Sequence, residues 1–362
     1  MKIEEVIKPH MEERIREIKE IPDETKDLLR VMGIPEDEWN FTVGLGTTLP
    51  PRYKRLRDTL LKEGVTFEEE KDENSSKLKI EFPPDREIST TLYLSCLSEC
   101  ALQPHKNIKI TFRRGSTGTV VIGGPVPKLF KTTAMTSNIE VELEENARGD
   151  VALLFSYDME TAARNNVKIR AGKKSVLAIS GVIFDPGKDL GIKWEFTAGD
   201  DSKILFDEIG FLHRRENYRG SWTEVTVGGK RVDVKINSAD FALGNGTSRA
   251  IYIAKVLRGA KGATVEIESY SMDFSSGADK TFLPGFYTEE DEVTLSHSAG
   301  SAHLTEEKVE YLKSRGLSDS DISRIIIDTV LEKTVYNKLP EEFVEETYNY
   351  TRFILSREHI KI

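Results

Sequence analysis

Between residues 108 and 269, short runs rich in β-branched and aromatic residues follow one another, with no helical pattern of ten residues between them. Many of these runs are separated by turn sequences such as AGKK at 171–174 and AGDD at 198–201. The runs lie at 108–112, 119–124, 139–143, 151–156, 175–184, 192–197, 203–209, 231–236, 250–256 and 263–269. Such a series predicts a mainly β fold that is a sandwich, a barrel or a stacked solenoid, and no strict repeat motif decides between these.

The first part of the chain carries helical patterns instead. Apolar residues recur every three or four positions over 3–18, which places them on one face of a helix. Two shorter helices are predicted over 23–32, stopped by Gly33, and over 51–63, followed by Gly64. Because their remaining faces are charged, packing and solvated surface account for all three helices.

The last part of the chain is predicted to form three further helices. Thr305 can cap a helix that runs to Arg315, where Gly316 supplies the left-handed residue that often ends a helix. Ser318 starts a second helix with Asp321 as its capping-box partner, and Pro340 opens a third. Three helices joined by short loops make a compact cap, whose apolar faces must bury against the β part or against another protein.

Charge and composition argue against several classes of protein. The 362 residues carry a net charge of −10 with no long basic block, so nucleic acid is not an expected partner. No apolar run is long enough to cross a membrane, and the N-terminal residues lack the apolar segment of a signal peptide. The only cysteines, Cys96 and Cys100, are too few for a disulfide framework, which favours a reducing, cytoplasmic setting.

One group of residues has the composition of a metal site. Cys96, Cys100 and His105 form a C-x3-C-x4-H pattern, and on a helix the two thiols would share one face. A structural metal site normally needs about four ligands, and the chain has no second cysteine pair. Buried packing is therefore the favoured interpretation of this group. His213, among the charged residues of FLHRREN, is interpreted as a solvated side chain.

Motifs that would indicate an enzyme are missing from the sequence. The stretches GLGTT at 44–48 and GGPVPKLFK at 123–131 do not match the phosphate-binding loop G-x-x-x-x-G-K-[ST], so the chain is not expected to hydrolyse nucleotide. The patterns G-x-S-x-G and H-E-x-x-H do not occur either. We therefore predict that the chain is not an enzyme. Taken alone, His297 and His303, which lie where strands give way to helices, favour a structural interpretation.

The end of the chain resembles the C-terminal region of the SufB/SufD family. That region has a His-x-Ala turn, a YL-x-x-RG helix end and an Ile-rich helix. Here these correspond to His297–Ala299, to YLKSRGLS at 311–318 and to Ile322–Leu331, and the specific match spans about 265–347. The strand-rich middle agrees with the family in character but not by motif, and residues 1–100 show no resemblance.

The resemblance implies both a fold and a role. The fold would be a right-handed parallel β-helix over 78–293, with an N-terminal helical region over 1–77 and a C-terminal helical domain over 294–362. SufB and SufD form the core of a complex that assembles iron–sulfur clusters, so this chain would be a non-catalytic core component. Its implied partners are a SufC-type ABC ATPase and a second SufB/SufD-type core subunit, either a copy of this chain or a different one.

The resemblance also implies which residues act. The C-terminal helices would bind the ATPase, and the residues expected near that surface are Tyr311, Arg315, Gly316 and Ile326. His297 would be a metal ligand at the site of the nascent cluster. We expect no cluster to be held stably by the chain alone, whereas a transient cluster fits the assembled complex.

The chain departs from SufB-like scaffolds at the other ligand positions. Those scaffolds have Glu-His-Glu at the turn, whereas Ser296 and Ser298 flank His297 here, closer to the Ser-His-Gly of SufD. They also have a cysteine in C-x-S-M about 28 residues before the histidine, where this chain has Ser269 in SYSM. A hydroxyl group cannot replace a thiolate as an iron or sulfur ligand. These departures favour a SufD-like role.

A second class of protein stays open at this stage. β-Helices also occur in carbohydrate-active lyases and hydrolases, which need a pair of carboxylates in a groove. The sequence does not place its many Asp and Glu side chains in space. The C-terminal match argues against this alternative, because such an enzyme has no use for a helical ATPase dock.

Overall fold

The structure of the protein is a computed structural model. The structure describes residues 21, 23–39, 50–71, 75–94, 105–123, 134–157, 161–212, 218–273, 277–302 and 306–357. Outside these described residues lie the predicted helix over 3–18, the candidate side chains Cys96, Cys100, His213 and His303, and the predicted helix cap Thr305.

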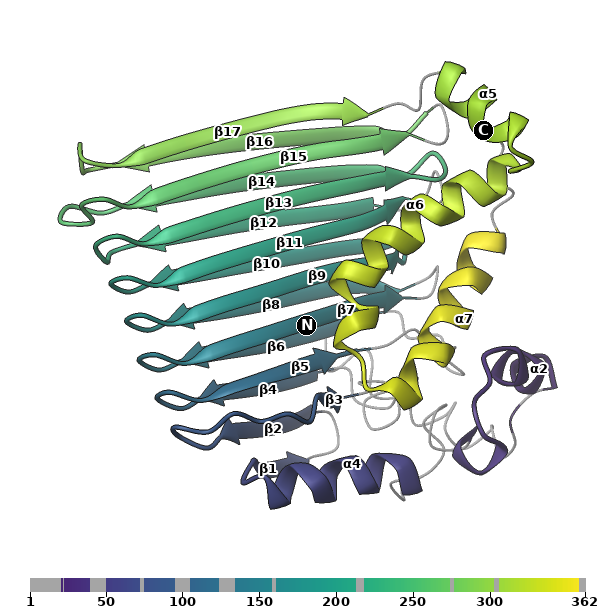
Figure 1. Cartoon of the computed structure of the whole chain (residues 1–362), viewed down its shortest axis with the longest axis horizontal. Helices are drawn as coiled ribbons and strands as arrows, with labels where there is room; N and C mark the ends of the chain where they lie inside the picture. The colour runs from purple at the N-terminus through teal and green to yellow at the C-terminus, as the bar shows by residue number, and fades with distance from the viewer. Residues whose placement is uncertain are drawn as a thin grey trace, which may run out of the picture.

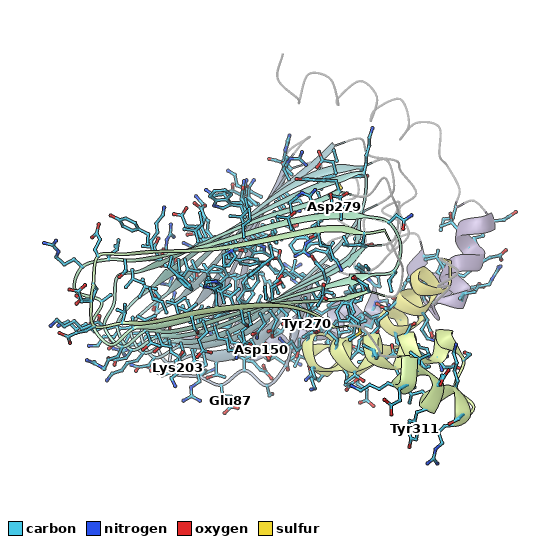
Figure 2. All side chains as sticks on the ribbon, turned by 90° about the horizontal axis from the view of Figure 1, so that it is seen from above. Glu87, Asp150, Lys203, Tyr270, Asp279 and Tyr311 are labelled. Atoms are coloured by element: carbon cyan, nitrogen blue, oxygen red, sulfur yellow. The ribbon has the colours of Figure 1, made fainter. Side chains whose placement is uncertain are left out.

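Two parallel sheets face each other and form a β-solenoid (Figures 1 and 2). Sheet A contains β1 (Thr66–Lys71), β2 (Ser75–Phe82), β4 (His105–Phe112), β6 (Ala134–Leu143), β8 (Ala162–Ala171), β10 (Asp189–Ala198), β12 (Tyr218–Val227), β14 (Thr247–Val256) and β16 (Asp279–Thr288). Sheet B contains β3 (Leu92–Leu94), β5 (Thr117–Ile122), β7 (Arg148–Tyr157), β9 (Val176–Pro186), β11 (Lys203–Leu212), β13 (Asp233–Ala242), β15 (Thr264–Asp273) and β17 (Thr294–Ala302). Described neighbours pair in parallel except β1 with β2, which confirms the predicted solenoid against an antiparallel sandwich. The strands extend on both sides of 78–293.

Helices lie at both ends of the chain, as the sequence predicts. They are α2 (Asp23–Val31), η1 (Glu36–Glu38), α4 (Pro51–Lys62), α5 (Glu306–Ser314), α6 (Asp319–Thr334), η2 (Tyr336–Lys338) and α7 (Glu341–Arg357). The predicted end signals are present, because Gly33, Gly64 and Gly316 have φ of +76°, +94° and +89°. Ser318 and Asp321 form the predicted capping box, in which the Asp321 N–H donates to Ser318 Oγ at 3.2 Å.

Several strands of the solenoid are absent from the predicted runs, among them β8, β12, β16 and β17. In β8, the buried Val167 and Ile169 alternate with the exposed Lys168 and Arg170, so only half of its residues are apolar. In β16, Pro284 interrupts a run of apolar residues. These sequences form strands because a parallel neighbour supplies their backbone partners, which outweighs local propensity.

Inward-facing side chains stack in register from one coil to the next. Paired positions along sheet A carry Ile80, Ile110, Val141, Ile169, Phe196, Val225, Ala254 and Phe286. All of these are buried except Phe286, which is only partly covered in the last coil. Burial of apolar surface contributes about 25 cal/mol per Å². The hydrophobic core is therefore a column that runs along the solenoid and ends uncovered at its last coil.

The turns that lead from sheet A to sheet B are stacked as well. Residues with a left-handed backbone occupy the same place in successive coils, at Asp85, Gly115, Asn146, Lys174, Asp201, Arg231 and Gly262. The N–H of each donates to a carbonyl of the next coil, as from Asn146 to Lys173 at 3.0 Å and from Lys174 to Asp200 at 2.8 Å. A left-handed conformation costs a non-glycine residue about 1–2 kcal/mol. The hydrogen bonds between coils offset that cost.

A buried ionic network lies inside the solenoid towards its last coils, and we call it the Glu208 network. The Glu208 carboxylate accepts hydrogen bonds from three neutral side chains, Trp194 (3.0 Å), Ser221 (2.8 Å) and Tyr252. It also lies 3.0 Å from Arg219, which pairs in addition with Asp240. Glu208 and Arg219 are both 0% exposed, so each depends on these partners for its charge.

The C-terminal helices pack against the outer face of sheet B. From the last coil, α6 runs back along the stack towards the first coils, and η2 and α7 follow it (Figure 1). Ile327, Leu331 and Phe343 are fully buried in this contact. Beyond α6, Lys338 Nζ lies 2.7 Å from Asp150 Oδ1 on β7 and 3.1 Å from Ser180 Oγ on β9. Part of the cap's apolar surface is thus buried within the chain itself.

Loss of the carboxylate at the centre of the Glu208 network should destabilise the fold strongly. We expect Glu208→Ala to lower the free energy of unfolding by about 3–5 kcal/mol, because it leaves Arg219 partly unpaired in a dry interior. The matched control is Glu224→Ala on the outer face of β12, where the carboxylate pairs with Lys255 at 2.8 Å. Its expected loss is about 0–1 kcal/mol. Denaturant unfolding measures both, and equal losses would contradict the assignment.

Candidate functional site

The last coil of the solenoid is open. Among the described strands, β16 ends sheet A and β17 ends sheet B, so each has a described strand neighbour on one side only. The inward-facing residues Phe282, Phe286 and Leu295 are only partly buried at this end. Exposed strand edges with apolar side chains beside them are places where another chain can pair. We place the candidate site at this end, because β17 contains His297, the histidine singled out in the sequence.

His297 lies on β17 with its side chain on the inward face. It pairs in register with Ile267 of β15, which is fully buried, and parallel partners point to the same side of a sheet. The imidazole ring lies 5.8 Å from the ring of Phe286 at 44°. The residue is nevertheless exposed, because no further coil covers it in the described part of the chain. His297 is therefore an accessible imidazole at the open end of an otherwise apolar column.

Ser269 lies close to this histidine. It pairs with Ala299, two residues beyond His297, and shares the inward face. With a strand spacing of about 4.8 Å and about 3.3 Å per residue, the Cα atoms of Ser269 and His297 lie roughly 8 Å apart. A cysteine at this position would thus lie beside the imidazole, whereas this chain offers a hydroxyl. Ser296 and Ser298 are exposed on the other face of β17.

The other sequence candidates do not join this site in the described part of the chain. His105 lies on β4, where its Nδ1 is hydrogen-bonded to Thr136 Oγ1. Six strand spacings of about 4.8 Å, roughly 29 Å, separate β4 from β16. Cys96 and Cys100 lie outside the described residues. Among the described residues, no group of three or more His, Cys, Asp or Glu side chains is arranged to hold a metal ion.

The polar interior beneath the open coil was not predicted from the sequence. The buried polar side chains extend from the Glu208 network to Lys280 on β16, and Lys280 contacts Asp273 on β15. Burial lowers the pKa of Lys280, against the opposing effect of Asp240. A signal for these residues exists in the sequence, because Ile204 and Phe206 set an alternation that places Glu208 inward. A charged residue in phase with buried ones marks an interior ionic group.

The four residues expected at the ATPase surface lie in the C-terminal helices, with different exposures. Tyr311 is 58% exposed at the outer end of the cap (Figure 2), and the Arg315 guanidinium lies 5.3 Å from its ring centroid. Gly316 adopts the left-handed conformation that ends α5. Ile326 packs partly buried against the core, whereas Ile325 is 47% exposed. The exposed surface of the cap thus includes Tyr311, Arg315 and Ile325.

A polar groove of about 440 Å³ lies on the outer face of sheet A near its first coils. Three asparagines on successive strands line it, with hydrogen bonds from Asn138 to Asn107 at 3.0 Å and from Asn166 to Asn138 at 3.1 Å. Its lysines lie beside carboxylates, as Lys77 does with Glu70 at 3.4 Å. Because its charges are paired, the groove lacks the unbalanced basic surface that binds phosphates.

Comparison with known proteins identifies the family. The family model for the SufBD core domain of SUF-system FeS cluster assembly matches residues 98–330, which is more than half of the chain. The chain belongs to the SufBD family. It is 22% identical to an iron–sulfur cluster assembly SufBD family protein of Pyrococcus horikoshii, over 94% of this chain and 84% of that protein. It is also 26% identical to the iron–sulfur cluster assembly protein SufD of Bacillus subtilis, over 44% of this chain and 40% of that protein.

Membership of the SufBD family confirms the resemblance seen in the C-terminal motifs. The matched range includes strands β4 to β17, His297, α5 and most of α6. This extent argues against the carbohydrate-active alternative, since one family pattern covers most of the solenoid together with the first helices of the cap. None of the described helices is both long and apolar enough to cross a membrane.

The open coil predicts different stabilities for two neighbouring substitutions. His297→Ala should change the free energy of unfolding by less than about 0.5 kcal/mol, because the side chain is exposed. Ile267→Ala, directly opposite on β15, should lower it by about 2–5 kcal/mol, because Ile267 is fully buried. Thermal and denaturant unfolding measure both. A large loss in His297→Ala would mean that the histidine is part of the packing.

Proposed function

We propose that this SufBD chain is a non-catalytic core subunit of a SUF complex that assembles iron–sulfur clusters. The observation that carries the proposal is the family match over residues 98–330, which includes an accessible His297 on the open coil. A solenoid with one end open and a helical cap along one face offers two separate contact surfaces. We assign the open end to a second core subunit and the cap to an ATPase.

The contact with a second core subunit is supported by the state of the last coil. The edges of β16 and β17 present backbone N–H and C=O groups without a strand partner in the described chain. Phe282, Phe286 and Leu295 leave apolar surface beside these edges. A second SufB/SufD-type subunit, either a copy of this chain or a different one, would pair with the edges and cover this surface. His297 would then lie at the junction of the two subunits.

The role at the junction is SufD-like rather than scaffold-like. An iron–sulfur cluster is normally held by about four protein ligands, mostly thiolates. The open coil supplies one imidazole, at His297, and a hydroxyl at Ser269 where SufB-like scaffolds have the cysteine. The nascent cluster is the cargo of the complex, and this chain would contribute one nitrogen ligand to it, while thiolates at this junction would come from a partner subunit that has the scaffold cysteine.

The contact with a SufC-type ABC ATPase is supported by the exposed surface of the cap. Tyr311 and Ile325 are large apolar or aromatic side chains that remain exposed, whereas Ile327, Leu331 and Phe343 of the same cap are buried. Aromatic and arginine side chains dominate the binding energy of many protein interfaces, and Arg315 stacked on Tyr311 has this composition. Hydrolysis of ATP would be the partner's chemistry, since this chain has no phosphate-binding loop motif.

Reversal of the arginine charge should weaken ATPase binding. We expect Arg315→Glu to reduce the affinity for the SufC-type partner about tenfold, equal to about 1.4 kcal/mol, by reversing a charge and removing the stacking on Tyr311. Co-purification and titration of the partner measure the effect. Lys333→Glu, an equal charge reversal at the exposed far end of α6, is the control and should bind normally. Equal affinities for both variants would place the dock elsewhere.

Removal of the imidazole should reduce cluster yield without loosening the complex. Loss of a residue that only hydrogen-bonds to a metal ligand reduces metal affinity about 10–100-fold, and loss of the ligand itself should have at least this effect. We therefore expect His297→Ala to lower cluster yield about tenfold or more in the assembled complex, measured as iron and sulfide after anaerobic assembly. His105→Ala, at the opposite end of the solenoid, is the control. Normal yield in His297→Ala, or a full cluster that survives desalting on the isolated chain, would contradict the proposed role.

A further inference from the structure

The N-terminal and C-terminal helices meet at a buried cluster of three charged side chains. Arg52, in the first turn of α4, lies between Glu38 at the end of η1 and Glu346 in α7. The Arg52 Nε lies 2.6 Å from Glu38 Oε2, and its second terminal nitrogen lies 2.5 Å from Glu346 Oε2. The three side chains, called the Arg52 cluster below, are 10%, 3% and 8% exposed. The cluster is therefore shielded from water.

The Arg52 cluster is the centre of the contact between α4 and α7. The other terminal nitrogen of Arg52 donates to the Glu342 carbonyl oxygen at 3.0 Å. The guanidinium also lies 4.4 Å from the ring centroid of Phe343, a fully buried side chain. One side chain of the N-terminal region thus binds a carboxylate, a carbonyl and an aromatic ring of α7 at once. Any change in the charge of this cluster acts directly on that contact.

The charges of the Arg52 cluster are unbalanced. One guanidinium faces two carboxylates, so the cluster carries a net charge of −1 when both are ionised. The titratable groups that surround it are Asp37 on η1, Tyr53 and Arg55 on α4, Tyr93 on β3 and Glu342 on α7. Arg55 is the one further cation in this described set, and it is exposed and pairs with Glu342 at 3.5 Å. A buried charge without a full partner is unfavourable by several kcal/mol.

Protonation of one carboxyl group relieves this imbalance. Burial raises the pKa of Glu346 to about 7, against the opposing effect of Arg52, and burial also raises the pKa of Glu38. When the contact opens and water reaches Glu346, its pKa returns towards 4.5. The closed cluster therefore holds a proton that the open one releases. This stabilisation is complete below about pH 4.5 and is lost as the pH rises through about 7.

We propose that the Arg52 cluster is a proton-dependent clamp between the N-terminal helices and α7, closed while one of its carboxyl groups is protonated and weakened when both are ionised. Because α7 continues from α6 and η2, the clamp determines how firmly the end of the cap is tied to α4. Acidification below neutrality tightens the clamp, and a return to neutral pH loosens it. The proposal involves neither the ATPase nor an iron–sulfur cluster, so it does not depend on the function proposed above.

Hydrogen exchange of the full-length chain tests the clamp. Backbone protection of Glu341–Arg357 is measured by mass spectrometry between pH 5 and 8 and corrected for the intrinsic exchange rate at each pH. If one proton is released on opening, protection should fall about tenfold per pH unit between about pH 5 and 6.5 and level off above about pH 7. In Glu346→Gln, which keeps the shape and an acceptor oxygen but cannot ionise, protection should stay high at all these pH values.

Glu345→Gln is the matched control, because Glu345 is the exposed neighbour on the same helix. It should keep the pH dependence of the unmodified chain. A pH slope in Glu346→Gln equal to that of the unmodified chain overturns the proposal. Protection of α7 that is flat with pH in the unmodified chain overturns it as well, and this measurement needs no variant. A slope lost in both Glu346→Gln and Glu345→Gln would assign the effect to the surface charge of α7 and also overturn it.

Discussion

The fold depends on backbone hydrogen bonds between successive coils. Each strand pairs in parallel with the strand one coil earlier, and each left-handed turn residue donates to the turn of the following coil. This repeated pairing fixes the register, and the register brings apolar side chains into one column. Even a sequence as polar as that of β8 forms a strand, because the neighbouring strands supply its backbone hydrogen-bond partners and pack against its inward-facing side chains. Packing and site placement follow from that register.

A stack of coils has two ends, and in this protein they differ in how far they are covered. The first coils are covered by α4 and joined to the C-terminal helices through the Arg52 cluster and Lys338. The last coil keeps free strand edges, partly covered aromatic side chains and the accessible imidazole of His297. One end is thus covered by helices, and the other leaves surface exposed for binding. The interior also differs between the two ends, since the Glu208 network and Lys280 lie towards the open end.

The class of fold was predictable from the sequence, but the regularity of its coils was not. Helix ends at Gly33, Gly64 and Gly316 were predictable, because local backbone chemistry determines them. The repeat of the coils was not predicted from the sequence. Each coil has a left-handed turn residue at the same place, but the type of residue varies, for example Asn146 in one coil and Arg231 in another. His297 was singled out by the family resemblance. That its side chain points inward follows only from the pairing of β17 with the neighbouring strand β15. The Arg52 cluster joins residues 294 positions apart, and no local pattern predicts such a contact.

The length of α6 has a consequence for the size of the solenoid. Its 16 residues span about 24 Å and cross the outer face of sheet B obliquely, in the direction from the last coils towards the first (Figure 1). At the end of that span, Lys338 meets Asp150 on β7. An additional coil would carry the start of α6 about 5 Å further away and leave Lys338 short of its partner. Repeat proteins can usually gain or lose units, but here an added coil would also require a longer helical cap if Lys338 is to keep its partner.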